Sequence, residues 1–175
     1  MKKLLISLIA VLFVSYLNPA KTNAQEIKLG GGLIIETDSP PLGLQFKGTY
    51  GLDMLLENLS GSVEFGIFLP KTTASYKYTR WGLDIDGNYT FWNMGDFNFY
   101  AVGGLNISSY SSKYTGPYTG PYYDDLDVTG TKPGLNLGAG VNFGFSANMS
   151  AYSEVKYILS NYDVAVINFG VLFTL

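Results

Sequence analysis

The sequence predicts an all-β fold: an eight-stranded antiparallel up-and-down transmembrane β-barrel, preceded by a cleaved signal peptide. Three observations predict it. The N-terminus has the organisation of an export signal, and eight later segments alternate apolar and polar residues with period two. The composition is rich in glycine (21 residues) and in aromatic residues (15%), yet poor in charge (14%), which is typical of a β-barrel and unusual for a helical domain.

Residues 1–24 resemble a secretory signal peptide. Two lysines follow the initiator methionine and precede an apolar run from Leu4 to Leu17, after which small residues lead to the expected cleavage site before Gln25. The run is too short for a helical membrane span, which needs about 20 apolar residues, so cleavage is favoured over a retained N-terminal anchor. The mature domain is therefore expected to be residues 25–175.

The composition of residues 25–175 excludes several classes of function. They include 8 basic and 14 acidic residues, a net charge of −6, and no basic cluster, which argues against a nucleic-acid partner. The absence of cysteine excludes a disulfide framework and a cysteine-linked lipid anchor. Because histidine is also absent, Ser–His and Cys–His catalysis and the common zinc sites are impossible.

The eight alternating segments share an apolar face of Leu, Ile, Val and Phe that carries no charge, whereas their opposite face is polar and rich in glycine. These segments are residues 26–36, 42–52, 61–69, 81–91, 97–108, 134–145, 151–157 and 165–175. Helical periodicity explains none of them as well. A charge facing lipid at the bilayer midplane costs ~2–4 kcal/mol, so an uncharged outer face is expected of a barrel in a membrane. A soluble barrel around an apolar ligand needs a more charged exterior and is the alternative.

Asp84, Asp86, Gly87 and Asn88 have a superficial similarity to a calcium-binding loop. An EF-hand loop needs glycine at position 6 and glutamate at position 12. Counted from Asp84, the glycine comes too early and Gly95 stands where glutamate is required. The stretch is therefore interpreted as a strand, and no metal site is predicted.

The connections suggest the orientation of the barrel. Residues 93–96 and 146–149 are predicted to form short turns at one end, the periplasmic one by the usual asymmetry of such barrels. The longer connections, 37–41, 70–75, 109–133 and 160–163, are expected at the extracellular end. Residues 53–60 belong to the periplasmic set, although their length and apolar character do not fit it.

Seven charged residues fall on the inward face and are expected to form a charge-paired lumen network. They are Lys28, Lys47, Glu64, Asp84, Asp86, Glu154 and Lys156. Buried charges need partners, and the interior of an eight-stranded barrel offers little room beyond its own side chains. A catalytic pair made by Asp84 with Asp86 or Glu64 is the alternative; we expect pairing, with no catalytic residue and no cofactor.

The segment 108–134 is of low complexity and repeats the letters TGPY in tandem. Its tyrosines and aspartates form a candidate surface-binding loop: Tyr110, Tyr114, Tyr118, Tyr122, Tyr123, Asp124, Asp125 and Asp127. Tyrosine offers a large amphipathic contact surface, and loops on rigid scaffolds often carry binding. A solvated loop without a fixed partner is the alternative, and the three aspartates could hold a cation weakly.

The whole mature chain, and most specifically its C-terminal FGVLFTL, resembles the small eight-stranded outer-membrane β-barrels of the OmpX and OmpA-transmembrane-domain type. The resemblance implies an outer-membrane location in a Gram-negative bacterium, contact with outer-membrane lipid, and a C-terminal signal for the barrel-assembly machinery. Gly170 and Phe173 match that signal. Leu175 stands where a terminal aromatic residue is usual, and Phe169 stands where a polar residue is commoner. Barrels of this architecture that are enzymes rely on histidine, so the resemblance implies no enzymatic activity here.

The sequence therefore predicts a monomeric, non-enzymatic barrel with a plugged lumen that acts as a structural or surface-interaction protein. Two alternatives remain: a narrow passive pore, and a soluble periplasmic barrel that binds an apolar ligand.

Overall fold

The computed structural model describes residues 26–37, 42–116, 127–161 and 163–175. The predicted signal peptide and the central part of the predicted tyrosine-rich loop lie outside these ranges. Within them, no helix has the length and apolar character needed to cross a membrane.

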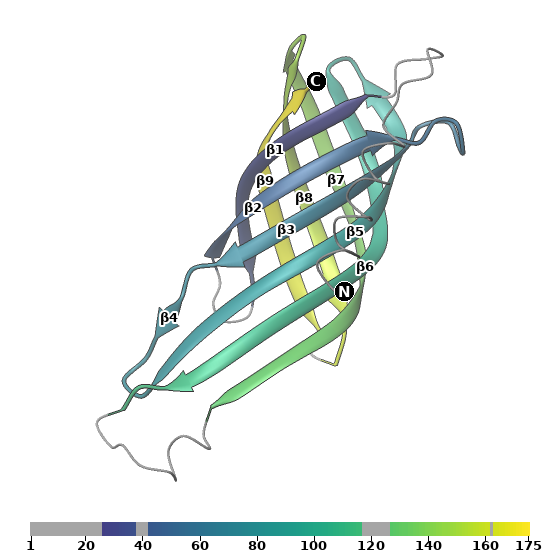
Figure 1. Cartoon of the computed structure of the whole chain (residues 1–175). Helices are drawn as coiled ribbons and strands as arrows, with labels where there is room; N and C mark the ends of the chain where they lie inside the picture. Colours follow the sequence, from purple (N-terminus) through teal and green to yellow (C-terminus); the bar gives the residue numbers. More distant parts are fainter. Residues whose placement is uncertain (1–25, 38–41, 117–126, 162) are drawn as a thin grey trace, which may run out of the picture.

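The described residues form one closed antiparallel sheet (Figure 1). Its strands are β1 (Ile27–Glu36), β2 (Leu42–Gly51), β3 (Leu59–Phe68), β4 (Lys71–Thr72), β5 (Tyr76–Met94), β6 (Phe97–Tyr114), β7 (Val128–Ser146), β8 (Met149–Leu159) and β9 (Val164–Thr174). Apart from β3 and β4, strands that follow one another along the chain pair with each other. β1 pairs with β9, and β3 pairs with β5 to close the barrel. Because β4 is only a two-residue extension beside β5, eight strands form the wall, which confirms the predicted fold class.

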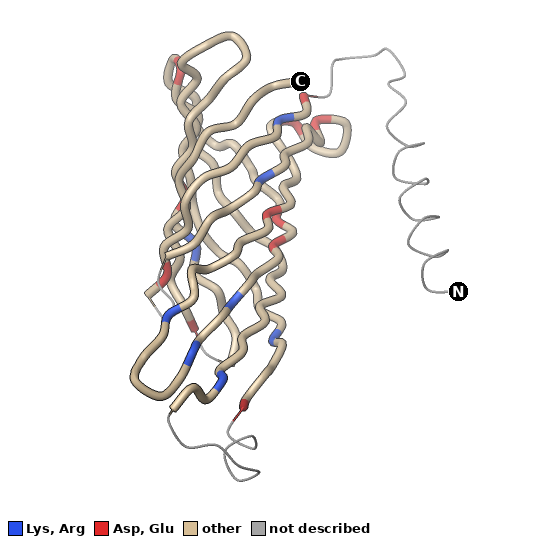
Figure 2. Tube along the Cα trace, turned by 60° about the vertical axis from the view of Figure 1, so that its left-hand side comes forward, with Lys and Arg blue, Asp and Glu red and all other residues tan. Residues whose placement is uncertain are grey.

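The side chains alternate across the wall as the sequence predicts, with the apolar face outward. On β2, Leu44 and Phe46 are 51% and 59% exposed, whereas Gln45 and Lys47 between them are 2% and 3% exposed. The same pattern holds in the other strands, whose charged positions lie along the barrel and at its two ends (Figure 2). An apolar exterior around a polar interior is the arrangement expected of a barrel in a lipid bilayer.

The strands β5, β6 and β7 are 18 or 19 residues long, compared with 10 or 11 for the other wall strands. They continue past the rest of the barrel as a three-stranded extension (Figure 1). The prediction that residues 109–133 form a loop is therefore wrong at both ends, since Ser112 still pairs with Val128. The extension lacks an apolar face, so the alternation of apolar and polar residues does not predict its strands. Hydroxyl pairs join these strands instead, such as Ser111 with Thr129, whose oxygens are 3.1 Å apart.

A β-bulge between Thr90 and Trp92 changes the inward face of β5. Before the bulge Thr90 pairs with Tyr100, and after it Asn93 pairs with Asn98. One extra residue in a strand reverses the alternation that follows it. Asn93 consequently turns inward, while Trp92 points outward and is 54% exposed.

The connection between β2 and β3, which the sequence pattern did not explain, is a compact turn. The Asn58 N–H donates to Asp53 Oδ1 at 3.0 Å, and the Leu52 and Leu59 backbones bond across its base at 2.8 Å. Asn58 adopts a left-handed conformation with φ of 65°, which asparagine tolerates better than most residues. The turn lies at the end of the barrel where β1 begins and β9 ends, together with the short turns at 95–96 and 147–148.

Candidate functional site

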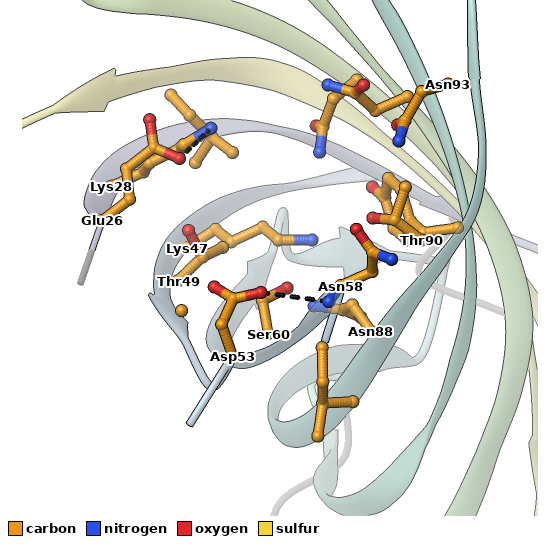
Figure 3. Close-up of a pocket in the computed structure, with 16 residues that line it drawn as sticks. Glu26, Lys28, Lys47, Thr49, Asp53, Asn58, Ser60, Asn88, Thr90 and Asn93 are labelled. Carbon is orange, nitrogen blue, oxygen red and sulfur yellow. Dashed lines mark hydrogen bonds and ion pairs between the residues drawn. The ribbon is translucent and has the colours of Figure 1, made fainter. Parts of the chain in front are cut away.

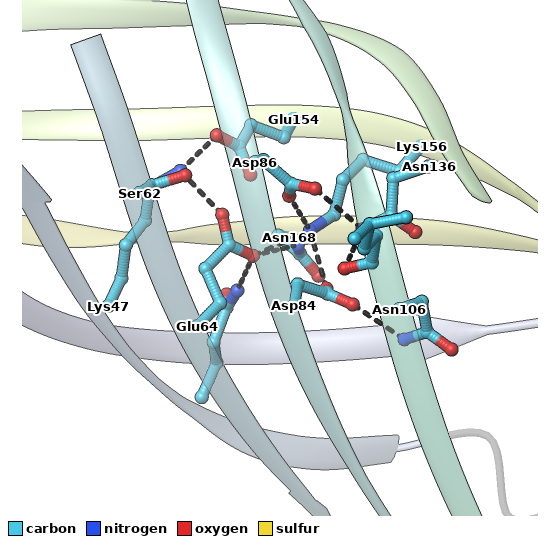
Figure 4. A network of polar contacts seen from close by, with 12 residues as sticks. Lys47, Ser62, Glu64, Asp84, Asp86, Asn106, Asn136, Glu154, Lys156 and Asn168 are labelled. Atoms are coloured by element: carbon cyan, nitrogen blue, oxygen red, sulfur yellow. Dashed lines mark hydrogen bonds and ion pairs between the residues drawn. The ribbon is translucent and has the colours of Figure 1, made fainter. Parts of the chain in front are cut away.

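The strand register brings six of the seven predicted lumen charges together. Lys47 lies directly opposite Glu64 across β2 and β3, and Glu64 lies opposite Asp84 across β3 and β5. The six charges, which we call the lumen network, are Lys47, Glu64, Asp84, Asp86, Glu154 and Lys156 (Figure 4). Each is at most 7% exposed, so the network lies in the barrel interior.

Lys156 is the centre of the lumen network and is fully buried. Its Nζ lies 2.7 Å from Glu64 Oε2, 2.6 Å from Asp84 Oδ2 and 3.0 Å from Asp86 Oδ2. Oxygens of these three carboxylates lie within 4.8 Å of one another, as a cation site would require. The ammonium group of Lys156, with its three donors, already satisfies that arrangement.

Lys47 joins the other side of the lumen network. Its Nζ lies 2.9 Å from Glu64 Oε1 and forms a second ion pair with Glu154. It also lies 4.9 Å from the centre of the Tyr152 ring, a cation–π contact. Tyr100 donates its hydroxyl hydrogen to Glu154 Oε1 at 2.8 Å.

Neutral side chains offset the excess of four carboxylates over two lysines. Asn106 Nδ2 donates to Asp84 at 2.5 Å, and Asn136 Nδ2 donates to Asp86 at 2.7 Å. Asn168 Nδ2 and Gln45 Nε2 both donate to Glu64. A buried carboxylate needs donors for its lone pairs, so these amides belong to the polar network. The pattern of charges in the sequence did not predict them.

Lys28 lies apart from this network, although the sequence predicted it there. Its Nζ pairs with Glu26 Oε2 at 3.1 Å, and the two side chains are 22% and 53% exposed. They lie at the mouth of the barrel, because Lys28 is the second residue of β1.

An apolar layer separates the lumen network from the opposite end of the barrel. It consists of Ile34, Phe68, Ile158, Val164 and Val166, all at most 6% exposed. These residues point inward near the ends of their strands, where one apolar residue, or two consecutive inward ones in β9, interrupts an otherwise polar face. Beyond them Arg80 lies over the Phe68 ring, 5.5 Å from its centre, and its Nη1 pairs with Glu36 Oε2 at 2.7 Å. The period-two pattern does not predict this layer, because it identifies the outward apolar face and these residues point inward.

The structure describes part of the candidate surface-binding loop. Tyr110 and Tyr114 belong to β6, and Asp127 Oδ1 accepts the Tyr114 backbone N–H at 2.9 Å. The Tyr76 and Tyr114 rings meet edge to face with centroids 5.5 Å apart. The remaining residues of the set, Tyr118, Tyr122, Tyr123, Asp124 and Asp125, lie outside the described residues.

The three residues of the predicted assembly signal lie on or just after β9. Gly170 faces Gly32 of β1, where a side chain would collide with the β1 backbone. Phe173 and Leu175 are 49% and 79% exposed on the outside of the barrel. Recognition of this strand by the assembly machinery stays a prediction.

Neither protein-family models nor curated proteins match this sequence. Several solved structures do match it. A major outer membrane protein of Thermus thermophilus superposes with a TM-score of 0.69 at 11% identity, covering 87% of this chain and 100% of that one. The N-terminal β-barrel domain of Pseudomonas aeruginosa OprF gives 0.61 at 14% identity, covering 86% and 97%. Ail, the attachment invasion locus protein of Yersinia pestis, gives 0.57 at 12% identity, also covering 86% and 97%.

The chain therefore has the fold of the small eight-stranded outer-membrane β-barrels. The predicted resemblance to that class is confirmed at the level of the fold.

Proposed function

We propose that the protein is a non-enzymatic barrel of the outer membrane with a plugged lumen, and that it acts as a structural scaffold for a surface-interaction segment. The observation that carries this proposal is the filled interior: the lumen network and the apolar layer lie one above the other inside the wall. An eight-stranded barrel has an interior just wide enough for side chains to fill.

The chemistry of the interior favours a structural role over catalysis. General acid–base catalysis needs a group within hydrogen-bond reach of a substrate. The carboxylates of the alternative catalytic pair are buried and contact Lys156, namely Glu64, Asp84 and Asp86. They are therefore already occupied by contacts within the barrel. The absence of histidine and cysteine from the sequence removes the usual nucleophile–base arrangements.

The polar interior and apolar exterior also favour the outer membrane over a soluble location. A soluble barrel with an apolar ligand needs the reverse arrangement. Fractionation of cells that express the full chain tests this: we expect the mature protein in the outer-membrane fraction, folded and heat-modifiable on gels. Recovery from the periplasmic fraction would overturn the proposal and favour the soluble alternative.

Conductance measurements test the plugged lumen. Purified protein reconstituted in a planar bilayer is expected to show no steady channels, with a general porin as the positive control. Long-lived, well-resolved channels would contradict the plugged lumen and favour the narrow passive pore.

The extension formed by β5, β6 and β7 supports the surface-interaction part of the proposal. Its connecting segment carries the tyrosines and aspartates predicted for binding, and loops on a rigid scaffold are common binding sites. Ail is described as an attachment invasion protein, and one of its structures contains the heparin analogue sucrose octasulfate. Since the segment here is acidic, we propose a different, non-polyanionic surface partner.

Replacement of residues 117–126 by an Asn-Gly turn tests this role. Loop closure depends only weakly on loop length, so folding is expected to persist while attachment of expressing cells to surfaces falls. A matched variant with Tyr118, Tyr122 and Tyr123 changed to Ser keeps the loop length and is expected to lose attachment as well. Unchanged attachment in both variants would overturn the surface-interaction role and leave a purely structural protein.

A further inference from the structure

A polar cavity of about 250 Å³ opens at the end of the barrel where β1 begins and β9 ends (Figure 3). We call it the vestibule and define it by Thr49, Asn88, Asn93, Asn98, Tyr100 and Asn142, which are among its lining residues. Its inner end is formed by Lys47 and Tyr100, which belong to or contact the lumen network. The vestibule is thus a pocket that ends at the network.

A row of three asparagines crosses one wall of the vestibule. Asn93 of β5 pairs with Asn98 of β6, which pairs in turn with Asn142 of β7. The bulge in β5 completes this row, because without it the position of Asn93 would face outward. Three neighbouring amides place donors and acceptors side by side, as recognition of several hydroxyl groups requires.

Two buried acceptors of the vestibule lack a protein donor. Asn88 is 4% exposed and donates its Nδ2 to Ser62 Oγ at 3.0 Å, yet no described residue donates to its Oδ1. The Oδ1 of Asn142 is likewise buried without a donor from the described residues. A buried carbonyl oxygen without a donor is costly, so both side chains gain from turning toward a ligand that brings O–H or N–H groups.

The charges around the vestibule are already engaged. Lys28 pairs with Glu26 at 3.1 Å, Lys47 pairs with Glu64 at 2.9 Å, and Asp53 accepts the Asn58 N–H at 3.0 Å. Neutral amides and hydroxyls, including those of Thr49, Ser60 and Thr90, make up the remaining polar lining. The lining therefore favours a neutral ligand over an ionic one.

We propose that the vestibule binds a small neutral polyhydroxylated molecule about the size of a single sugar ring. Its volume lies just below the ~300–1,000 Å³ of typical small-molecule pockets, which limits the ligand to that size. Once the side chains of Asn88 and Asn142 turn toward the cavity, sugar hydroxyls donate to their carboxamide oxygens and accept from the amide groups of the asparagine row. This binding site goes beyond the proposed scaffold role and uses none of the tyrosine-rich loop.

Saturation-transfer NMR of the full mature chain in lipid nanodiscs tests the proposal, with glucose and N-acetylglucosamine as probes. Glucoside and maltoside detergents are avoided because their head groups would compete. We expect saturable transfer to both probes with millimolar or better affinity, and none to gluconate or to cyclohexanol, which are respectively charged and poor in hydroxyls.

Three variants make the test specific to the vestibule. Asn93→Trp at the exposed rim and Asn142→Leu within the row are each expected to weaken sugar binding at least tenfold. Asn148→Leu, in the neighbouring exposed turn, is expected to bind like the parent protein. Folding of each variant is checked by heat-modifiable migration, and Asn93→Trp provides the test if Asn142→Leu fails to fold. No saturable transfer to either sugar, or equal binding by all three variants, would overturn the proposal.

Discussion

Lys156 shows how single residues stabilise the interior of this barrel. It is fully buried, and its Nζ contacts Glu64, Asp84 and Asp86 within 3.0 Å. Removing one partner from a buried ion pair leaves uncompensated charge and costs about 3–5 kcal/mol. Lys156→Met is therefore expected to lower the free energy of unfolding by about that amount, measured by urea titration of protein reconstituted in lipid vesicles.

Lys28→Met is the matched control. Lys28 also forms an ion pair on the inward face, but with an exposed partner at the mouth of the barrel. Pairs of this kind contribute about 0–1 kcal/mol, so the urea midpoint is expected to change little. Equal effects of the two substitutions would contradict the central role of Lys156.

Gly140 illustrates the space that the buried aromatic residues need. A Cβ at this position would collide with the ring of Tyr100, the side chain that donates to Glu154. Gly140→Val is expected to reduce the yield of folded barrel because Tyr100 must move away from Glu154. The control is Gly103→Val, where an added Cβ meets no atom within 4 Å. Heat-modifiable migration after refolding measures both, and normal folding of Gly140→Val would show that the ring has room to move.

At the scale of the element, β7 contains two environments on one outward face. Leu137 is 56% exposed in the part of the strand that pairs with β8, whereas Thr131 lies in the extension beyond the last β8 partner. Leu137→Arg is expected to cost ~2–4 kcal/mol, since the charge faces lipid, and to impair membrane assembly. Thr131→Arg is expected to assemble normally. Outer-membrane recovery of the two variants measures the difference, and normal assembly of Leu137→Arg would mean that this face does not contact lipid.

At the scale of the whole molecule, the two ends of the barrel differ in length and chemistry. The short turns lie at the end where β1 begins and β9 ends, and the β5–β7 extension projects from the other end. Short turns are periplasmic in barrels of this kind. An epitope tag placed between residues 117 and 126 is therefore expected to bind antibody on intact cells, while a tag after Ala147 binds only after permeabilisation. The opposite result would invert the orientation.

The period-two pattern by itself determined the architecture of this protein. Leu44 and Phe46 alternating with Gln45 and Lys47 specify both the strand and the side that faces out, because the side-chain period of a strand is two. Absence of charge on that face then predicts lipid as the solvent outside the barrel. The same pattern puts six charges on the inward face, and each of them is at most 7% exposed in the structure.

Only the tertiary structure decided features that depend on pairing between strands. The cross-strand register brings Asn106, Asn136 and Asn168 within hydrogen-bond distance of the buried carboxylates. It also places Lys28 at the mouth of the barrel, away from those carboxylates. The bulge that turns Asn93 inward and the polar extension to Tyr114 have no periodic signal of their own. Alternation reports which side of one strand is apolar, whereas contacts across a closed barrel depend on the register of all eight strands together.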